Sequence, residues 1–183
     1  PGMFGAEPSV AAKKSIKLFK EKNIKNIVEL GAGLGRDTIF FAKNSINVKA
    51  LDYSLNAIKI INQKIENDNL FKFVNTKIFD IREKLPFSDN SIDGFFSHML
   101  YCMALSTKQI KNLNNEICRV LKSNGLNIYT VRHTNDGDYK KGIHRGEDLY
   151  ENDGFIVHYF SSNKINSLLK SFLSTSTPIK SLT

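Results

Sequence analysis

The residues best placed to do chemistry are acidic side chains and a histidine near the ends of short apolar runs. Glu29 lies two residues before the first of three closely spaced glycines, Gly31, Gly33 and Gly35. Asp52 ends the next apolar run. A glycine-rich turn lets a ligand approach the backbone and directs free N–H groups at it, and a carboxylate after the following strand can accept both ribose hydroxyls. This arrangement predicts a nucleoside-binding site.

The spacing of the glycines argues against a dinucleotide. In the dinucleotide fingerprint the third glycine comes three positions after the second, where the helix packs closely on the strand. Here Arg36 occupies that position, and the third glycine, Gly35, comes one position early. A P-loop is excluded because no Gly-Lys-Ser/Thr follows the turn. The glycine spacing therefore fits NAD poorly. The alternative to a nucleoside site is that the glycines only form a tight turn between strand and helix and bind no ligand.

The elements that must position these residues alternate between strand and helix patterns. Apolar runs predict strands at residues 26–31, 48–52, within 72–79, 92–98 and 126–131. Apolar periodicity predicts helices at residues 9–22, 36–44, from the cap Ser54 to 67–69, from Ser106 or Thr107 to about 121, and near 162–172. Gly125 is the expected C-terminal stop of the fourth helix.

Strands that alternate with helices build a parallel sheet with right-handed crossovers. Ligands of such sheets lie beyond the carboxyl ends of the strands, near the switch point. We therefore expect an α/β fold in which Gly31, Asp52, Asp80 and His98 surround one crevice.

The turn resembles motif I of the class I S-adenosylmethionine (SAM)-dependent methyltransferases, Glu/Asp-x-Gly-x-Gly-x-Gly, at residues 29–35. Further segments resemble that family in order and spacing: 52–53 (the acidic end of strand two), 79–81 (the adenine segment), 85–93 (the approach to strand four) and 121–126 (the turn before strand five, with Asn124 where glycine is commoner). The resemblance covers about residues 20–135. It implies a Rossmann-like three-layer sandwich with a mostly parallel central sheet, and methyl transfer from SAM that leaves S-adenosyl-L-homocysteine.

The resemblance also implies a cofactor-binding set. Glu29, Gly31 and Gly33 would border the methionine part of SAM, and Asp52 would accept the ribose hydroxyls. Tyr53 would pack on adenine, with ordinary surface packing as the alternative. Asp80 and Ile81 would meet the adenine edge, unless Asp80 only caps a turn. The remaining expected members are Ala32, Gly35, Arg36 and His98.

His98 is the first residue expected to contact the methyl acceptor, either as a general base or as a polar side chain that lines the site near the methyl group. The alternative is a histidine that is buried in the core and hydrogen-bonded there. A base is needed only for a nucleophile that is protonated at working pH. Tyr101 and Cys102 follow and would shape the acceptor pocket, although Cys102 as a nucleophile has little support.

A segment rich in arginine and histidine follows the fifth predicted strand. It contains Arg132, His133, His144 and Arg145, and it is long enough to act as a lid. Such side chains suit a carboxylate or oxyanion acceptor. The alternative is that Arg145 pairs with Glu147 or Asp148 and only orders the loop. The expected catalytic set is His98, Tyr101, His144 and Arg145, and no compact ligand spacing predicts a metal.

Composition indicates one domain over residues 1–183, with an N-terminal helical segment (1–24), a cofactor-binding core (25–135) and a lid loop (136–160). The net charge is +8, but the lysines are scattered and no Asn/Asp-Pro-Pro-Tyr/Phe follows strand four, so nucleic acid is disfavoured. We expect a small-molecule acceptor, anionic or a soft nucleophile; a closer but weaker resemblance is to tellurite-resistance and thiopurine-type methyltransferases. The alternatives are an RNA or protein methyltransferase and a SAM-binding protein without turnover.

Two further expectations concern the edge of the sheet and the cell compartment. Residues 173–183 have room for one short strand, so strands six and seven of the usual fold are either truncated or built differently, and a monomer or a homodimer is expected. Cys102 and Cys118 have no framework partners, and no signal peptide or membrane span is seen, which favours free thiols and the cytoplasm.

Overall fold

The larger of two sheets carries the elements that the sequence predicts. The structure is a computed structural model that describes residues 7–173 and 179–181. All six strands of this sheet are parallel, in the order β10-β5-β4-β1-β2-β3. Their bounds are β1 (Asn26–Leu30), β2 (Asn47–Asp52), β3 (Val74–Ile78), β4 (Ile92–Ser97), β5 (Leu121–Tyr129) and β10 (Ile179–Ser181). The chain reverses direction across the sheet between β1 and β4, so the switch point lies there.

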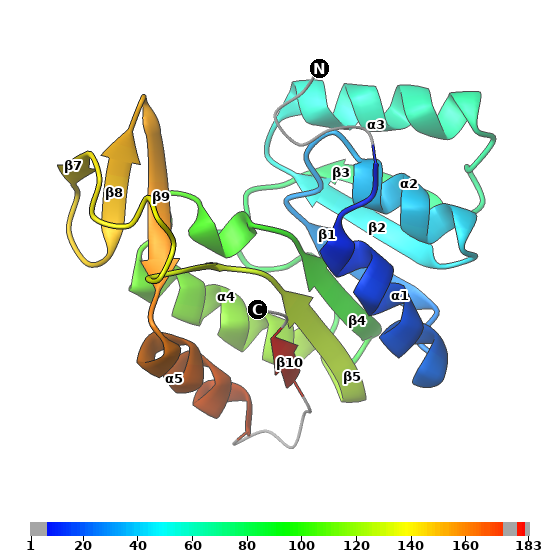
Figure 1. Cartoon of the computed structure of the whole chain (residues 1–183). Helices are drawn as coiled ribbons and strands as arrows, with labels where there is room; N and C mark the ends of the chain where they lie inside the picture. Colours follow the sequence, from blue (N-terminus) through cyan, green and yellow to red (C-terminus); the bar gives the residue numbers. More distant parts are fainter. Residues whose placement is uncertain (1–6, 174–178, 182–183) are drawn as a thin grey trace.

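Helices cover both faces of this sheet, which gives the predicted three layers (Figure 1). One core cluster joins the sheet to α1 (Val10–Glu21), α2 (Arg36–Lys43) and α3 (Leu55–Asn67), and the other joins it to α4 (Thr107–Val120) and α5 (Ser162–Leu173). Neighbouring side chains on a central strand point to different clusters: in β4, Phe96 belongs to the first and Phe95 to the second, and both are fully buried. Each such burial stabilises the fold by about 1.5–3 kcal/mol.

Serine caps set the helix starts. The hydroxyls of Ser9, Ser54 and Ser106 each accept a hydrogen bond from a backbone N–H in the first turn of α1, α3 and α4. Ser106 also forms a reciprocal capping box with Gln109. The expectation that Ser54 begins the third helix is confirmed, and Ser106 rather than Thr107 caps the fourth.

The predicted role of Gly125 is wrong. Helix α4 ends at Val120, and β5 begins at the next residue in extended conformation. The ladder with β4 starts at Leu121, is interrupted, and resumes at Leu126. A Cβ at Gly125 would lie 2.8 Å from the backbone oxygen of Asp93. The glycine therefore permits close strand approach within an irregular stretch of β5 rather than ending a helix.

The segment expected to be a lid loop contains strands. The second sheet has the order β6-β9-β8-β7, with β6 (Arg132–His133), β7 (Ile143–His144), β8 (Leu149–Asn152) and β9 (Phe155–Phe160). β6 pairs parallel with β9, and the other pairs are antiparallel. Figure 1 shows β7, β8 and β9 beyond the carboxyl ends of β4 and β5. We call residues 132–160 the small-sheet segment.

β10 pairs parallel with β5 at the edge of the larger sheet, which agrees with room for one short strand. In the chain, the connection from β4 to β5 consists of the short 3₁₀ helix η1 (Leu100–Cys102) followed by α4. Within the described residues, no helix combines the length and apolar character that crossing a bilayer requires.

Candidate active site

The three glycines of the turn after β1 have positive φ but different surroundings. Their φ angles are 67° at Gly31, 55° at Gly33 and 75° at Gly35. A Cβ at Gly31 would lie 2.8 Å from Leu100 Cδ1, and one at Gly35 would lie 2.6 Å from Ile61 Cγ1. A Cβ at Gly33 would meet no described atom within 4 Å. Gly31 and Gly35 therefore serve packing, whereas Gly33 leaves its backbone open to a ligand.

Asp52 organises this turn from the end of β2. Its Oδ2 accepts a hydrogen bond from Gly33 N at 2.8 Å, and its Oδ1 accepts one from Ser54 N at 2.9 Å. Each carboxylate oxygen can accept a second hydrogen bond, so both retain capacity for a ribose hydroxyl. The side chain thus shapes the turn and has the oxygens that a nucleoside ligand needs.

Glu29 lies beneath the turn as a buried carboxyl group. Thr38 Oγ1 donates a hydrogen bond of 2.5 Å to Glu29 Oε2, and 3% of the residue is exposed. Desolvation is the largest of the influences that together raise the pKa of Glu29 to about 8; the hydrogen bond from Thr38 and the charge of Arg36 oppose it, whereas the nearby Asp37 and Asp52 reinforce it. The group is therefore mostly protonated at neutral pH.

Tyr53 and Asp80 line one surface hollow together with Phe79. Tyr53 is 79% exposed, so its ring is available for stacking. Asp80 accepts hydrogen bonds from the backbone N of Arg82 at 2.9 Å and from its guanidinium, and these bonds lower the pKa of Asp80. Ile81 packs against the second core cluster. Arg82, the hydrogen-bond donor to Asp80, was not among the predicted site residues, although a cation two residues after an aspartate is a recognisable signal for such a pair.

His98 and Thr130 meet at the carboxyl ends of β4 and β5. The strands are in register at Ser97 and Tyr129, and His98 Nδ1 lies 3.0 Å from Thr130 Oγ1. Burial is the main cause that lowers the pKa of His98; Asp37 raises it and Arg36 lowers it. His98 therefore lies at the switch point, near the start of α2. Thr130 was missed because it falls inside the fifth predicted strand, 126–131, where nothing in the sequence signals a contact with His98.

Tyr101 and Cys102 belong to the core and not to the crevice. Tyr101 is fully buried, donates a hydrogen bond of 2.5 Å to Asn114 Oδ1 and stacks on Tyr129. Arg132 N donates to Cys102 Sγ at 2.8 Å, and burial raises the pKa of the thiol to about 12. The expectation that Tyr101 and Cys102 shape the acceptor pocket is corrected, because η1 directs both side chains inward.

His144 and Arg145 lie on or next to β7 and are exposed. Arg145 Nε donates to Glu151 Oε2 at 2.6 Å, so the expected partners Glu147 and Asp148 are wrong. Ile143 is directly opposite Glu151 in the β7–β8 ladder, and Arg145 N donates to Leu149 O, so the Arg145 side chain reaches Glu151 diagonally across the hairpin. His144 Nε2 lies 2.9 Å from the backbone oxygen of Glu147. In the described part of the chain, the recorded polar contacts of His144 and Arg145 stay within the hairpin.

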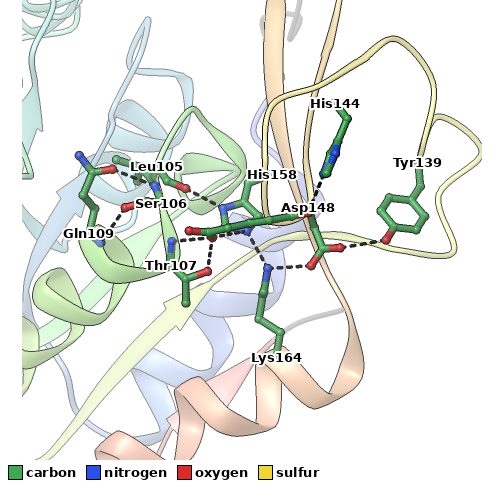
Figure 2. Close-up of polar contacts among 10 residues, drawn as sticks. Leu105, Ser106, Thr107, Gln109, Tyr139, His144, Asp148, His158 and Lys164 are labelled. Carbon is green, nitrogen blue, oxygen red and sulfur yellow. Dashed lines mark hydrogen bonds and ion pairs between the residues drawn. The ribbon is translucent and has the colours of Figure 1, made fainter.

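A polar network fixes the small-sheet segment to α4 and α5 (Figure 2). Glu147 Oε2 accepts hydrogen bonds from the backbone N of Thr107, at 2.9 Å, and from its hydroxyl. Lys164 Nζ donates to Asp148 Oδ2 at 2.8 Å. The first contact joins the segment to the start of α4, and the second joins it to α5.

His158 is at the centre of this network and is fully buried. Its Nδ1 lies 2.6 Å from the backbone oxygen of Leu105, and its Nε2 lies 2.9 Å from Lys164 Nζ. A backbone oxygen only accepts and an ammonium only donates, so Nδ1 carries the proton and the ring is neutral. Burial, above all, lowers the pKa of His158. Together with Glu147, Asp148, Thr107 and Lys164, His158 forms what we call the anchoring network.

Comparison with known proteins agrees with this geometry. Residues 27–125, more than half of the chain, match the family described as "Methyltransferase domain". Phosphoethanolamine N-methyltransferase 1 of Triticum aestivum is 36% identical over 102 residues, which is 55% of this chain and 20% of that protein. An uncharacterized chloroplastic methyltransferase of Arabidopsis thaliana is 33% identical over 130 residues, 68% of this chain and 36% of that protein. The chain thus spans between a fifth and about a third of these relatives.

Solved structures share the fold over most of the chain. The PH0226 protein from Pyrococcus horikoshii has a TM-score of 0.71 at 17% identity, covering 89% of this chain and 82% of that chain. A SAM-dependent methyltransferase from Methanosarcina mazei has a TM-score of 0.69 at 18% identity, covering 81% and 79%. The chain therefore belongs to the methyltransferase domain family, with the Rossmann-like fold of class I methyltransferases and S-adenosylmethionine as its cofactor.

Proposed function

We propose that this protein transfers a methyl group from SAM to a small-molecule acceptor by in-line displacement. One observation carries the proposal: Gly33, Asp52 and His98 lie at the same switch point of the sheet. No described atom lies within 4 Å of the position that a Cβ of Gly33 would take, and each carboxylate oxygen of Asp52 accepts one hydrogen bond and can accept another. A donor-binding turn and a candidate acceptor-side residue are thus at the ends of adjacent strands. Alignment of the two substrates is the main task of such an enzyme.

The residues present fit the cofactor. Asp52 would accept the ribose hydroxyls, and the backbone around Gly33 would contact the methionine part above Glu29. Tyr53 would stack on adenine, and Asp80 would accept from its edge. When bound, SAM supplies an electrophilic methyl group on a sulfonium.

The chain's own residues orient the reactants and exclude water. The small-sheet segment lies beyond the carboxyl ends of β4 and β5, and the anchoring network holds it there (Figures 1 and 2). We propose that it covers the acceptor as a lid and limits solvent access. His98 is neutral because its pKa is lowered, so it can border the acceptor without repelling a cationic donor.

The acceptor class is inferred from relatives and from the charges at the site. The Triticum relative is named for methylation of phosphoethanolamine, a small molecule. Arg132 is already paired with Asp136 and Asp138, and Arg145 with Glu151. An anionic acceptor would compete with these carboxylates for the guanidinium groups, whereas a soft, neutral nucleophile would not. We further propose a monomer or homodimer in the cytoplasm, where the free thiols of Cys102 and Cys118 would stay reduced.

An acceptor screen tests this function. The protein is incubated with SAM and with thiols, metalloid oxyanions, small acids, phosphorylated amines, RNA or a peptide mixture, and formation of S-adenosyl-L-homocysteine is measured. We expect turnover with one small-molecule class and loss of turnover in Asp52→Ala. Transfer to RNA at physiological ionic strength would contradict the acceptor class. Tight SAM binding with no transfer to any class would indicate a SAM-binding protein without turnover.

A further inference from the structure

Thr130, the residue after β5, makes three contacts with the segment that leaves β4. Its backbone N donates to Ser97 O at 3.1 Å. Its Oγ1 accepts a hydrogen bond from Met99 N at 2.8 Å and lies 3.0 Å from His98 Nδ1. One residue thus holds three consecutive residues at the switch point.

These contacts decide the tautomer of His98. A threonine hydroxyl has one proton and two lone pairs. The Met99 amide can only donate, so it uses one lone pair. Within the described residues, the group within hydrogen-bond distance of the hydroxyl that is able to accept its proton is His98 Nδ1. Donation to Nδ1 leaves the ring proton on Nε2, whereas the opposite tautomer would leave the hydroxyl proton without a described acceptor.

The same contacts stabilise a strained turn next to the cofactor. Met99 has a φ of 63°, a conformation that costs a non-glycine residue energy and persists where the surroundings impose it. Its amide is held by Thr130, and the following residue, Leu100, lies against Gly31 of the cofactor turn. Thr130 therefore links the ring of His98 to the turn that faces SAM.

We infer that Thr130 is a positioning residue that holds His98 as the neutral Nε2–H tautomer, so that His98 offers the acceptor a hydrogen-bond donor and not a general base. The inference rests on the proposed function for its acceptor and adds to it a residue and a role. In the described part of the chain, no hydrogen-bond partner of Nε2 is recorded. Burial lowers the pKa of the ring, with Asp37 and Arg36 of α2 as the charged groups that face it.

This role narrows the substrate class. An Nε2–H group recognises a lone pair, so the acceptor should carry an oxygen that accepts a hydrogen bond close to its methylated atom. A neutral hydroxyl oxygen satisfies this requirement. A nucleophile that must lose a proton to this ring before the transfer does not, because the nitrogen that faces the acceptor already carries a proton.

Nitrogen-15 NMR of the full chain labelled in its histidine rings tests the inference without cofactor or acceptor. The chain has four histidines, and His98→Gln identifies the signals of His98. Near pH 8 we expect a protonated, pyrrole-type Nε2 and a bare, pyridine-type Nδ1. Thr130→Val should shift His98 toward a mixture of tautomers, and Thr130→Ser, which keeps the hydroxyl, should restore the wild-type spectrum.

Two results would overturn the inference: a proton on Nδ1 of His98 in the wild-type protein, or the same His98 spectrum in wild type and folded Thr130→Val. If Thr130→Val does not fold, the wild-type tautomer alone decides. A parallel titration of the wild-type protein with SAM separates this outcome from the proposed function, because absence of SAM binding would contradict the function and leave the tautomer result unchanged.

Discussion

Glu29 predicts a pH dependence of stability at the level of one residue. Burial raises its pKa from 4.5 to about 8, so between these pH values the folded protein holds a proton that the unfolded chain releases. Stability should therefore fall as the pH rises through this window. Glu29→Gln keeps an oxygen for Thr38 and cannot ionise. We expect it to be more stable than wild type at pH 8, by at most about 5 kcal/mol, and nearly equal in stability at pH 4.5.

Urea denaturation of both proteins at several pH values measures this difference. Equal slopes of unfolding free energy against pH for wild type and Glu29→Gln would show that Glu29 is ionised in the folded protein, contrary to its burial.

A matched pair of glycine variants separates packing from ligand access. Gly33→Ala should cost about 1–2 kcal/mol, because the only penalty is a left-handed backbone in open space. Gly35→Ala should cost about 1–3 kcal/mol more, because its Cβ would overlap Ile61. We expect Gly33→Ala to remain folded at 25 °C and yet to bind SAM weakly. Chemical denaturation and SAM titration check both expectations; equal destabilisation, or an unchanged SAM affinity in Gly33→Ala, would contradict them.

Sequence order was a good guide to residues at strand ends and a poor one to residues that act through a neighbour. Glu29, Asp52 and His98 could be placed because each lies in or at the end of a recognisable strand. Thr130 acts on the ring of His98 across two strands, so only the register of β4 and β5 reveals it. Tyr101 was misassigned because the inward direction of η1 depends on the Met99 turn, which no local pattern signals.

At the scale of elements, the small sheet was predicted as a loop because its strands are short and its pairing is partly distant. β6 pairs with β9 across more than twenty residues, and such pairing leaves no local trace. A local signal did exist for the β8–β9 hairpin: Asp153-Gly154 forms the connection, and both residues have positive φ, as a two-residue hairpin turn requires. The role of Gly125 was misjudged for a similar reason, since the pairing of Leu121 with β4 begins the strand before Gly125 is reached.

The anchoring network predicts how firmly the small-sheet segment is held. Lys164→Met removes the ion pair with Asp148 and the contact with His158, both partly or fully buried. We expect a loss of local stability of about 1–3 kcal/mol, because a charged hydrogen bond is lost and Asp148 is left without its cation. Hydrogen exchange of residues 143–160 should become correspondingly faster, while β1, β2 and β4 stay protected.

Lys141→Met is the matched control, because the Lys141–Asp138 ion pair is exposed and such pairs contribute about 0–1 kcal/mol. If Lys164→Met and Lys141→Met exchange alike in the small-sheet segment, the anchoring network does not hold this segment in place.

At the scale of the whole molecule, the three-layer architecture could be predicted because alternating strand and helix patterns leave few topologies. The observed order places β1 between β2 and β4, which puts Gly33, Asp52 and His98 at one edge. The parallel pairing of β10 with β5 could not be predicted, since a three-residue strand has too little pattern. The position of the small sheet over the carboxyl ends likewise depends on contacts with α4 and α5 that lie far along the chain.

Isothermal titration calorimetry with SAM and with NAD tests most directly whether this edge binds SAM. Wild-type protein should bind SAM and give no heat with NAD. Asp52→Ala should weaken SAM binding by about 1.5–3 kcal/mol per lost hydrogen bond, or at least about tenfold, while Asp68→Ala, which only removes an exposed pair with Lys43, should bind like wild type. If the folded wild-type protein gives no binding heat with SAM, or binds NAD and not SAM, the claim that this edge of the sheet binds SAM is contradicted.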